Sequence, residues 1–238
     1  MRPIHRGNVP GVGGLPKAYT RYQEAIGDLE DRLGVYCSYC ERRLPASLEV
    51  EHVSPKSIDP AHERDWNNFL LGCKNCNTVK ASKPTNIPDF LWPDRDNTFL
   101  AFKYSKGGFV AVQDNLGADV NAKATALCNL IGLDRHKLGG AGKKPRSRDK
   151  RWKDREQIWK LAEDQKSRLQ KFPPDLQDAA RTFIADSAEG FGCFSVWMTV
   201  FHDDPKVRAA LVQRMPATTQ SQCFDANGQP ISRVGGRI

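Results

Sequence analysis

Two Cys-x-x-Cys pairs constrain this chain of 238 residues more than any other feature of its sequence. The pairs are Cys37 with Cys40 and Cys73 with Cys76. Each short pair offers two thiolates to one metal ion, and two such pairs complete the four ligands of a tetrahedral structural zinc site. The alternative, four unrelated buried thiols, requires two matched pairs to coincide. We therefore predict one zinc ion that closes a folded insert of the 32 residues between Cys40 and Cys73.

Composition restricts the cellular setting and the class of partner. No stretch approaches the roughly 18 apolar residues needed to cross a membrane, and the first residues lack the apolar segment of a secretion signal. We expect no membrane contact and a cytoplasmic location. The formal net charge of +8 favours a polyanionic partner, most simply nucleic acid. In a reducing cytosol, three isolated cysteines are expected to be small buried apolar residues: Cys128, Cys193 and Cys223.

Periodicity and turn residues predict a strand, a second strand and a helix around the zinc site. Apolar residues at helical spacing favour a preceding helix that Gly34 ends. The predicted elements are a helix over residues 17–33, strands over 48–53 and 66–71, and a short helix over 74–82. This order is a ββα arrangement.

The remaining chain is mostly helical in pattern. A hairpin is expected over residues 98–104 and 109–113, followed by helices over 118–133, 151–171, 174–189, 193–202 and 205–215, and a small hairpin at Asn227-Gly228. Residues 138–150 combine glycines with a basic cluster and mark a soft boundary. We predict an α+β protein with a zinc-stabilised ββα core in residues 1–138 and a basic linker and helical region in residues 139–238.

Polar residues inside the zinc-closed insert carry the functional signal. Glu51-His52, Asn68, Asn77 and Lys80 follow one another around the second cysteine pair, with Asn77 directly after Cys76. In this order and spacing the segment resembles the zinc-bearing HNH endonucleases of ββα-metal fold. Many HNH motifs have aspartate where this chain has Glu51, so which of its oxygens reaches a metal stays open.

These residue types suit phosphodiester hydrolysis. A neutral imidazole takes a proton from water at physiological pH, which makes His52 the expected general base. Glu51 and Asn77 offer hard oxygen ligands to Mg²⁺ or Mn²⁺. Asn68 is expected to pin a loop and orient His52, and Lys80 to contact a flanking phosphate. Because neighbours on a strand point to opposite faces, Glu51 and His52 need a bend to share one site.

Other interpretations remain beside these assignments. Taken alone, His52 would be a strand histidine satisfied by backbone hydrogen bonds. His62 is expected to be a solvated loop residue, and Asn67 is a neighbour that sequence does not separate from Asn68. Trp152 and Trp159 favour a helix core face over base stacking. A solvated linker and a phosphate-binding patch remain equally open for one basic run: Lys143, Lys144, Arg146, Arg148, Lys150 and Arg151.

A closer resemblance extends beyond the motif. The phrases LGVYCSYCERRL, VEHVSPKS, WNNFLLGCKNCNTVK, LWPD, NLIGLDRH and CFDANGQPISR are similar to the HNH proteins of Septu-type antiphage defence, the PtuB family, and to HNH proteins that accompany some retrons. The resemblance implies a nuclease effector beside an ABC/SMC-like ATPase of the PtuA type, with residues 139–238 available to dock it. It also implies zinc ligation by the four paired cysteines and cleavage by Glu51, His52, Asn68 and Asn77.

Three functional hypotheses follow from these observations. The first is a metal-dependent HNH endonuclease, with DNA favoured as substrate and an RNA target such as tRNA as the variant. The second is a zinc-knuckle protein that binds nucleic acid without chemistry. The third is a structural adaptor whose basic helical part holds a protein partner. Only the first gives Glu51, His52 and Asn77 a common role.

Overall fold

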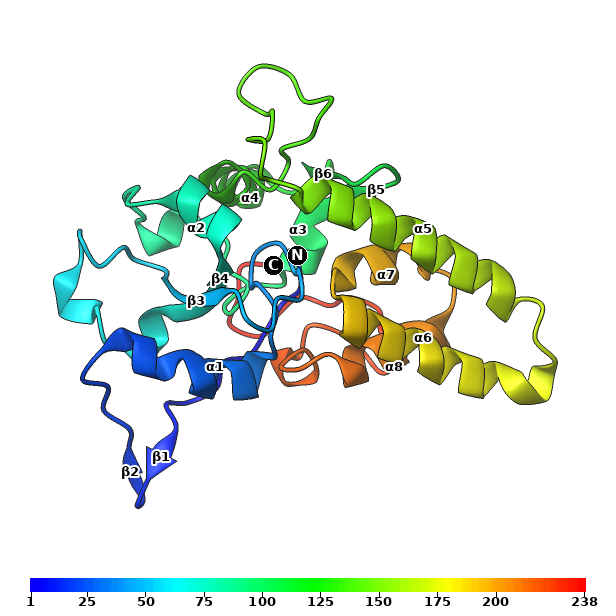
Figure 1. The fold of residues 1–238 in the computed structure, drawn as a ribbon, viewed down its shortest axis with the longest axis horizontal. Coiled ribbons are helices and arrows are strands. Elements are labelled where there is room, and N and C mark those ends of the chain that lie inside the picture. Colours follow the sequence, from blue (N-terminus) through cyan, green and yellow to red (C-terminus); the bar gives the residue numbers. More distant parts are fainter.

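Two groups of secondary-structure elements lie at opposite ends of the molecule, with both chain termini near its middle (Figure 1). The computed structural model describes residues 1–238, apart from the side chain of Val12. One end carries α1 (Ile26–Leu33), β3 (Leu48–His52), β4 (Phe69–Cys73) and α2 (Lys74–Lys80). The other end carries α5 (Arg151–Leu169), α6 (Gln177–Phe191), α7 (Phe194–Val200) and α8 (Pro205–Arg214). The α+β prediction is confirmed.

The strands β3 and β4 form a two-stranded antiparallel sheet between α1 and α2. Their register runs from Leu48 opposite Cys73 to His52 opposite Phe69. A 3-10 turn, Trp66–Asn68, precedes β4, and the side chain of Asp65 accepts a hydrogen bond from the backbone N–H of Asn67 at its start. The expected strand over residues 66–71 therefore begins three residues later. The ββα order predicted from the sequence is present.

The helix expected over residues 17–33 is shorter than predicted. A 3-10 turn spans Tyr22–Ala25, and α1 begins only at Ile26. Side-chain contacts hold the preceding segment extended, because Lys17 and the Tyr19 hydroxyl both bind the carboxylate of Asp28. Tyr19 also stacks on Trp66. The helix ends as expected at Gly34, whose φ of 70° favours glycine.

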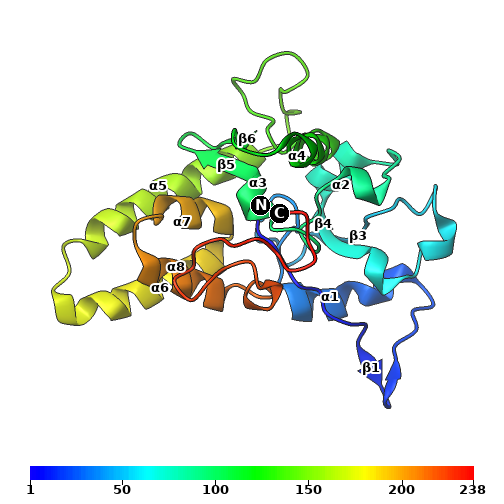
Figure 2. The same cartoon turned by 180° about the vertical axis from the view of Figure 1, so that it is seen from behind.

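A hairpin and a helix connect the two ends of the molecule. The segment Thr98–Ala101 forms a helical turn, α3, and the hairpin consists of β5 (Phe102–Ser105) and β6 (Phe109–Val112). The predicted first strand, residues 98–104, was thus too long, because the side chain of Asn97 caps α3. Helix α4 (Ala118–Ile131) follows. Figure 2 shows the loop between α4 and α5 projecting from the side that carries α2 and α4. Small β1 (Gly11–Val12) and β2 (Leu15–Pro16) form a separate hairpin.

One cluster of buried side chains continues through both ends of the molecule. Glu41, directly after the first cysteine pair, contributes a buried polar link. Its carboxylate accepts hydrogen bonds from the Ser195 backbone and hydroxyl, both at 2.7 Å, and from the Tyr104 hydroxyl at 3.0 Å. The isolated cysteines 128, 193 and 223 are buried, as predicted. A division of the chain near residue 138 stays a prediction.

Two smaller expectations concern the helical end and the tail. Trp159 is half-buried and packs against the core, as expected for a core-facing residue. Trp152 contacts His136 edge to face and lies under the ammonium of Lys137.

The tail forms one bridge, Phe224 opposite Pro230, around the expected turn. Within the described chain, no helix combines the length and apolar character needed to cross a membrane.

Candidate zinc and catalytic centre

The four paired cysteines converge on one point at the base of the β3–β4 sheet. All four sulfur atoms lie within 4.8 Å of one another and are buried. The Sγ atoms of Cys37 and Cys76 are 3.7 Å apart, and those of Cys40 and Cys73 are 3.6 Å apart. Zinc–sulfur bonds of about 2.3 Å in a tetrahedron place sulfurs about 3.8 Å apart. The thiolates therefore fit a structural zinc ion.

Donors around the sulfurs support their ionised form. The backbone N–H groups of Cys73 and Cys76 point at the sulfurs of Cys37 and Cys73, at 3.3 and 3.5 Å. A guanidinium nitrogen of Arg151 donates to the sulfur of Cys76 at 3.2 Å, and this arginine is only 2% exposed. Four thiolates around Zn²⁺ carry two excess negative charges, which a buried guanidinium offsets. Sequence reasoning placed Arg151 in the basic run and had no signal for this contact, since 75 residues separate it from Cys76.

A groove of about 590 Å³ runs along β3, and all five residues of that strand line it. Because β4 pairs with only one edge of β3, the groove follows the other edge. Four of the predicted site residues line this groove: Glu51, His52, Asn77 and Lys80. Asn68 lies behind it. The structure therefore brings the candidate base and the candidate metal ligands to one cavity.

His52 sits on the α1 side of the sheet with one ring nitrogen occupied. The side chain is 8% exposed and contacts Tyr22 and Phe69 edge to face. Its Nε2 lies 2.9 Å from the backbone carbonyl oxygen of Glu63. Because a carbonyl only accepts hydrogen bonds, Nε2 carries the proton and Nδ1 keeps its lone pair. Nδ1 is thus the atom that acts as a base.

The pKa of His52 is expected to lie below 6.5, whereas the pKa of His62 is expected above that value. Burial lowers the pKa of the His52 imidazole, because the charged form loses hydration. The hydrogen bond with Asp59 raises the pKa of His62, which is exposed as predicted. An NMR titration of both imidazoles in the zinc-loaded protein measures this order. Equal pKa values, or the reverse order, would contradict the buried position of His52.

Glu51 and Asn77 occupy the opposite side of the sheet, against α2. The Asn77 Nδ2 donates to Glu49 at 2.8 Å, whereas its buried Oδ1 has no hydrogen-bond partner. A Cβ at Gly72 would lie 2.2 Å from this Oδ1 and 3.0 Å from the Cβ of Glu51. Glycine at position 72 thus leaves room for an amide oxygen close to the Glu51 side chain. An unsatisfied oxygen next to a carboxylate fits a hard divalent cation that keeps several waters.

The sequence predicted that Lys80 contacts a flanking phosphate, but its side chain lies inside the domain. The ammonium is 2% exposed, forms an ion pair with Oε1 of Glu51 at 3.0 Å and donates to the carbonyl of His52 at 2.6 Å. Tyr39 also donates to Oε1 of Glu51, which leaves Oε2 for a ligand. Burial raises the pKa of the Glu51 carboxyl, and Lys80 opposes that rise. Lys80 therefore orients and ionises Glu51, because its side chain turns inward from α2.

Adjacent positions on β3 send Glu51 and His52 to different faces of the sheet. Glu51 contacts Tyr39 and Lys80, whereas His52 contacts Tyr22 and Phe69. The sequence indicated that Glu51 and His52 need a bend in the strand to share one site. The groove makes a bend unnecessary, because it passes around the free edge of β3 and reaches both faces. A phosphate in the groove would meet the base from one side and the metal ligands from the other. In-line displacement needs this opposition.

Asn68 pins the loop that precedes the sheet's second strand. Its Oδ1 accepts from the Ser54 backbone N–H at 2.7 Å, and its Nδ2 donates to the carbonyls of Ser54 and His62. The loop supplies the Glu63 carbonyl that holds His52, so Asn68 positions the base indirectly. Asn67, which sequence did not separate from Asn68, is exposed.

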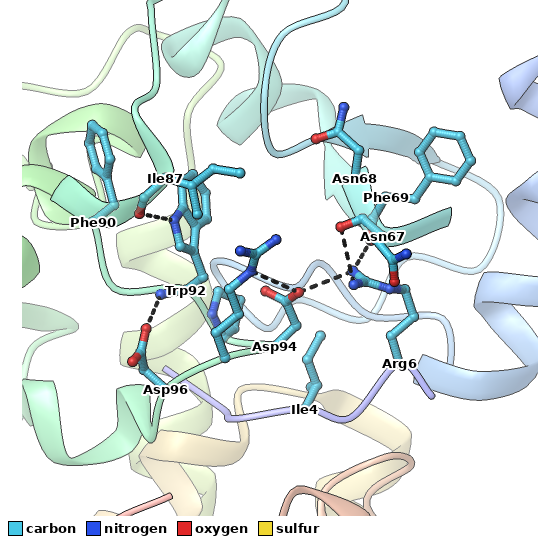
Figure 3. Close-up of polar contacts among 12 residues, drawn as sticks. Ile4, Arg6, Asn67, Asn68, Phe69, Ile87, Phe90, Trp92, Asp94 and Asp96 are labelled. Atoms are coloured by element: carbon cyan, nitrogen blue, oxygen red, sulfur yellow. Dashed lines mark hydrogen bonds and ion pairs between the residues drawn. The ribbon is translucent and has the colours of Figure 1, made fainter. Parts of the chain in front are cut away.

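The N-terminal arm clamps the start of β4 through a buried ion pair. Arg6 donates to the carbonyls of Phe69 and Asn67 and pairs with Asp94 at 3.1 Å (Figure 3). Asp94 belongs to the LWPD phrase, in which the Trp92 ring nitrogen donates to the carbonyl of Ile87. The network fixes the carbonyl side of Phe69, the residue opposite His52. Arg6 and Asp94 were missed because their partners are distant in sequence.

Two further groove residues were missed by sequence reasoning. Glu49 accepts from Asn77, and Lys56 lies 4.2 Å from the ring centroid of Tyr22 beside His52. Glu49 could have been predicted from the sequence, because residues two apart on a strand share a face, and Glu49 therefore shares one with Glu51. Lys56 could not have been predicted, since it lies on an irregular loop.

Replacing Gly72 by alanine is expected to abolish divalent-ion binding at the site with little loss of fold. The new Cβ displaces the Asn77 amide, which can move because it is a side chain, so its oxygen no longer lies beside Glu51. Isothermal titration of Mg²⁺ into the zinc-loaded protein measures the loss. Gly190→Ala is the control, since a Cβ at that position meets no atom within 4 Å. Unchanged Mg²⁺ affinity in Gly72→Ala would contradict the assignment of Asn77.

Comparison with known proteins agrees with this geometry. No curated protein matches the chain by sequence. The family model described as HNH endonuclease matches residues 37–83. The matched segment begins at the first zinc cysteine and contains β3, β4 and α2. Residues 37–83 are thus similar to the HNH endonuclease domain.

Proposed function

We propose that the protein is a metal-dependent endonuclease that hydrolyses phosphodiester bonds of nucleic acid, with DNA favoured. One observation carries the proposal: the groove along β3 holds His52 on one side and the Glu51 and Asn77 oxygens on the other. The basic charge of the chain supports a polyanionic substrate. A zinc-knuckle protein without chemistry gains nothing from an imidazole with a free Nδ1.

The residues act as follows. His52 Nδ1 takes a proton from water as the water oxygen bonds to phosphorus and the bond to the 3′ oxygen breaks, and the departing 3′ oxygen takes a proton from solvent. The Nε2–H bond to the Glu63 carbonyl holds the ring and stabilises the imidazolium that forms. Glu51 and Asn77 would hold Mg²⁺ or Mn²⁺, and Lys80 and Tyr39 keep Glu51 in place. When bound, that ion supplies positive charge to the phosphate and the departing 3′ oxygen.

The four cysteines would hold a structural zinc ion, which takes no part in the hydrolysis. Their site is closed, with all four sulfurs buried and no position left for water among them. Its contribution is to fix Cys76, the residue before Asn77, and hence the start of α2.

The proposal is tested by incubating the purified protein with duplex DNA and, separately, with total tRNA. Each substrate is assayed with Mg²⁺, with Mn²⁺ and without added divalent ion, and zinc content is measured after each reaction. We expect cleavage of DNA only when Mg²⁺ or Mn²⁺ is present and zinc is retained. Cleavage of tRNA alone would identify an RNA nuclease. Tight nucleic-acid binding without cleavage of either would support the binding-only alternative.

We also propose the finer role that the Septu-type resemblance implies: a cytoplasmic antiphage effector that acts beside an ABC/SMC-like ATPase of the PtuA type. An apolar surface on the helical end supports a protein partner, because Phe183 on α6 is 70% exposed and shares a shallow cavity with Phe172. Residues 139–238 are then the docking part. The test is cleavage with and without the purified ATPase, together with their elution on size exclusion. Separate elution and unchanged cleavage would contradict the partnership.

A further inference from the structure

A second cationic cavity lies on the other side of α2 from the catalytic groove. Its volume is about 290 Å³. Its lining comes from three separate parts of the chain, and the polar side chains that matter are Lys74 and Thr78 of α2, Arg135 after α4, and Arg146 and Arg148 of the loop before α5. Figure 1 shows that loop rising beside α2 and α4. Residues distant in sequence thus place four cations around one hollow.

The charges of this cavity are not compensated. Within the part of the chain that the structure describes, none of its four cationic side chains forms an ion pair. The one acid in the lining, Asp149, is buried and held by Arg151 at 2.7 Å. By contrast, Lys143 in the same loop binds Asp134 at 2.6 Å and lies outside the cavity. Unpaired cations around a concave surface concentrate positive potential there.

The structure therefore separates the basic run that sequence left undivided. Arg146 and Arg148 face the cavity, Lys143 is paired, and Arg151 is buried against the zinc thiolates. Of these four residues, only Arg146 and Arg148 remain available to an anion in the cavity. These two arginines lie beside the helix that carries Asn77.

The two cavities lie on different faces of one helix, α2. Asn77 and Lys80 line the catalytic groove, whereas Lys74 and Thr78 line the second cavity, so α2 separates the two. A helix with its side chains is about 10–12 Å wide. The two cavities therefore suit different phosphates of one substrate strand.

We propose that this cavity binds a backbone phosphate of the substrate that flanks the cleaved one. The inference rests on the proposed nuclease function and extends it from the scissile phosphate to the path of the strand. The guanidinium groups of Arg146 and Arg148 bind phosphate oxygens, with Lys74 and Arg135 adding charge. Contacts of this kind fix the register of the strand and read no base sequence.

The test measures binding in the His52→Ala protein, so that cleavage does not remove the ligand. Arg146→Ala with Arg148→Ala is compared with Lys143→Ala with Lys144→Ala, which removes equal charge from the same loop. The probes are a long DNA duplex, a duplex short enough to fill only the catalytic groove, and a structured RNA, each over a range of salt.

We expect the double arginine variant to bind the long duplex at least tenfold more weakly, with a salt slope lower by about 0.9 for each lost phosphate contact. The short duplex should bind equally well to the parent and to both variants. Equal weakening by the lysine pair would mean a diffuse field and overturn the proposal, as would unchanged binding by the arginine variant. Weaker binding of the RNA in addition to the long duplex would show that the cavity accepts the backbone of either nucleic acid.

Failure of the nuclease proposal gives a different result. If the parent protein with His52 cleaves no nucleic acid but the arginine pair still lowers long-duplex binding, the cavity stands and the nuclease assignment falls. If the parent cleaves and the arginine pair leaves long-duplex binding unchanged, only the cavity proposal falls.

Discussion

His52→Ala is expected to lower the rate of cleavage by about 10²–10⁴-fold, the usual contribution of a positioned general base. The reason is that Nδ1 is the free ring nitrogen in a groove that also holds the metal ligands. Nucleic-acid affinity should change little, because the ring is 8% exposed and packs against Tyr22 and Phe69. Single-turnover cleavage in Mg²⁺, with binding measured separately, gives both quantities.

His62→Ala is the matched control for this change. His62 lies in the same insert, but its imidazole is exposed and contacts Asp59 on its own loop. Its removal should leave the rate within about twofold, as for a surface substitution away from the site. Equal cleavage by wild type and His52→Ala would remove His52 from the mechanism.

Cys73→Ser is expected to release zinc and unfold residues 37–83. Structural zinc contributes an apparent binding free energy of about 10–16 kcal/mol at pH 7, which equals or exceeds the whole stability of a typical domain. The sulfur of Cys73 lies in the closed set of four and also accepts the backbone N–H of Cys76 at the start of α2. Zinc per chain by mass spectrometry and thermal unfolding by circular dichroism measure the effect.

Cys128→Ala separates zinc loss from the general cost of a buried substitution. Cys128 is buried in α4 and lies outside the four-sulfur cluster. We expect full zinc content and a loss of about 1 kcal/mol of unfolding free energy, the central value for point substitutions. Full zinc content and unchanged melting in Cys73→Ser would show that the four thiolates bind no structural metal.

Loss of zinc should also remove the catalytic site. Asn77 directly follows Cys76 on α2, and its Oδ1 lies over Gly72 at the second cysteine pair. Without the metal, the cysteine pairs no longer hold the start of this helix, and only contacts such as those of Lys80 connect it to β3. A zinc ion at the four cysteines would therefore support the proposed hydrolysis indirectly, by holding Asn77 in place.

Local signals in the sequence predicted most elements correctly. The glycine after α1 takes positive φ at the helix end, as the stop signal indicated. The strand β3 and the helix α2 lie where alternation and the cysteine pair placed them. The errors fall at element starts, where side chains outside the periodic pattern decide: Asp28 holds residues 17–21 extended, and Asn97 turns the expected first strand into α3.

For the candidate site, the sequence likewise predicted the residues but not their arrangement in space. Its residues were readable because an acid next to a histidine, with an asparagine after Cys76, is a local pattern. The arrangement of these residues could not be predicted from the sequence, because it depends on which face of a sheet is covered and which edge is free. Lys80 shows the difference: a lysine near a phosphate site suggested an outward contact, whereas packing against Glu51 turned it inward.

The sequence by itself determined the four-cysteine cluster, four of the groove residues and the α+β character of the chain, since spacing and residue chemistry are properties of neighbouring positions. Only the tertiary structure decided that Glu51 and His52 meet across a strand edge, that Arg151 lies against the cysteine cluster, and that Arg146 and Arg148 face a cavity. Those outcomes depend on contacts between residues tens of positions apart. Buried charges must find partners wherever the chain brings them, and no local pattern specifies which partner that is.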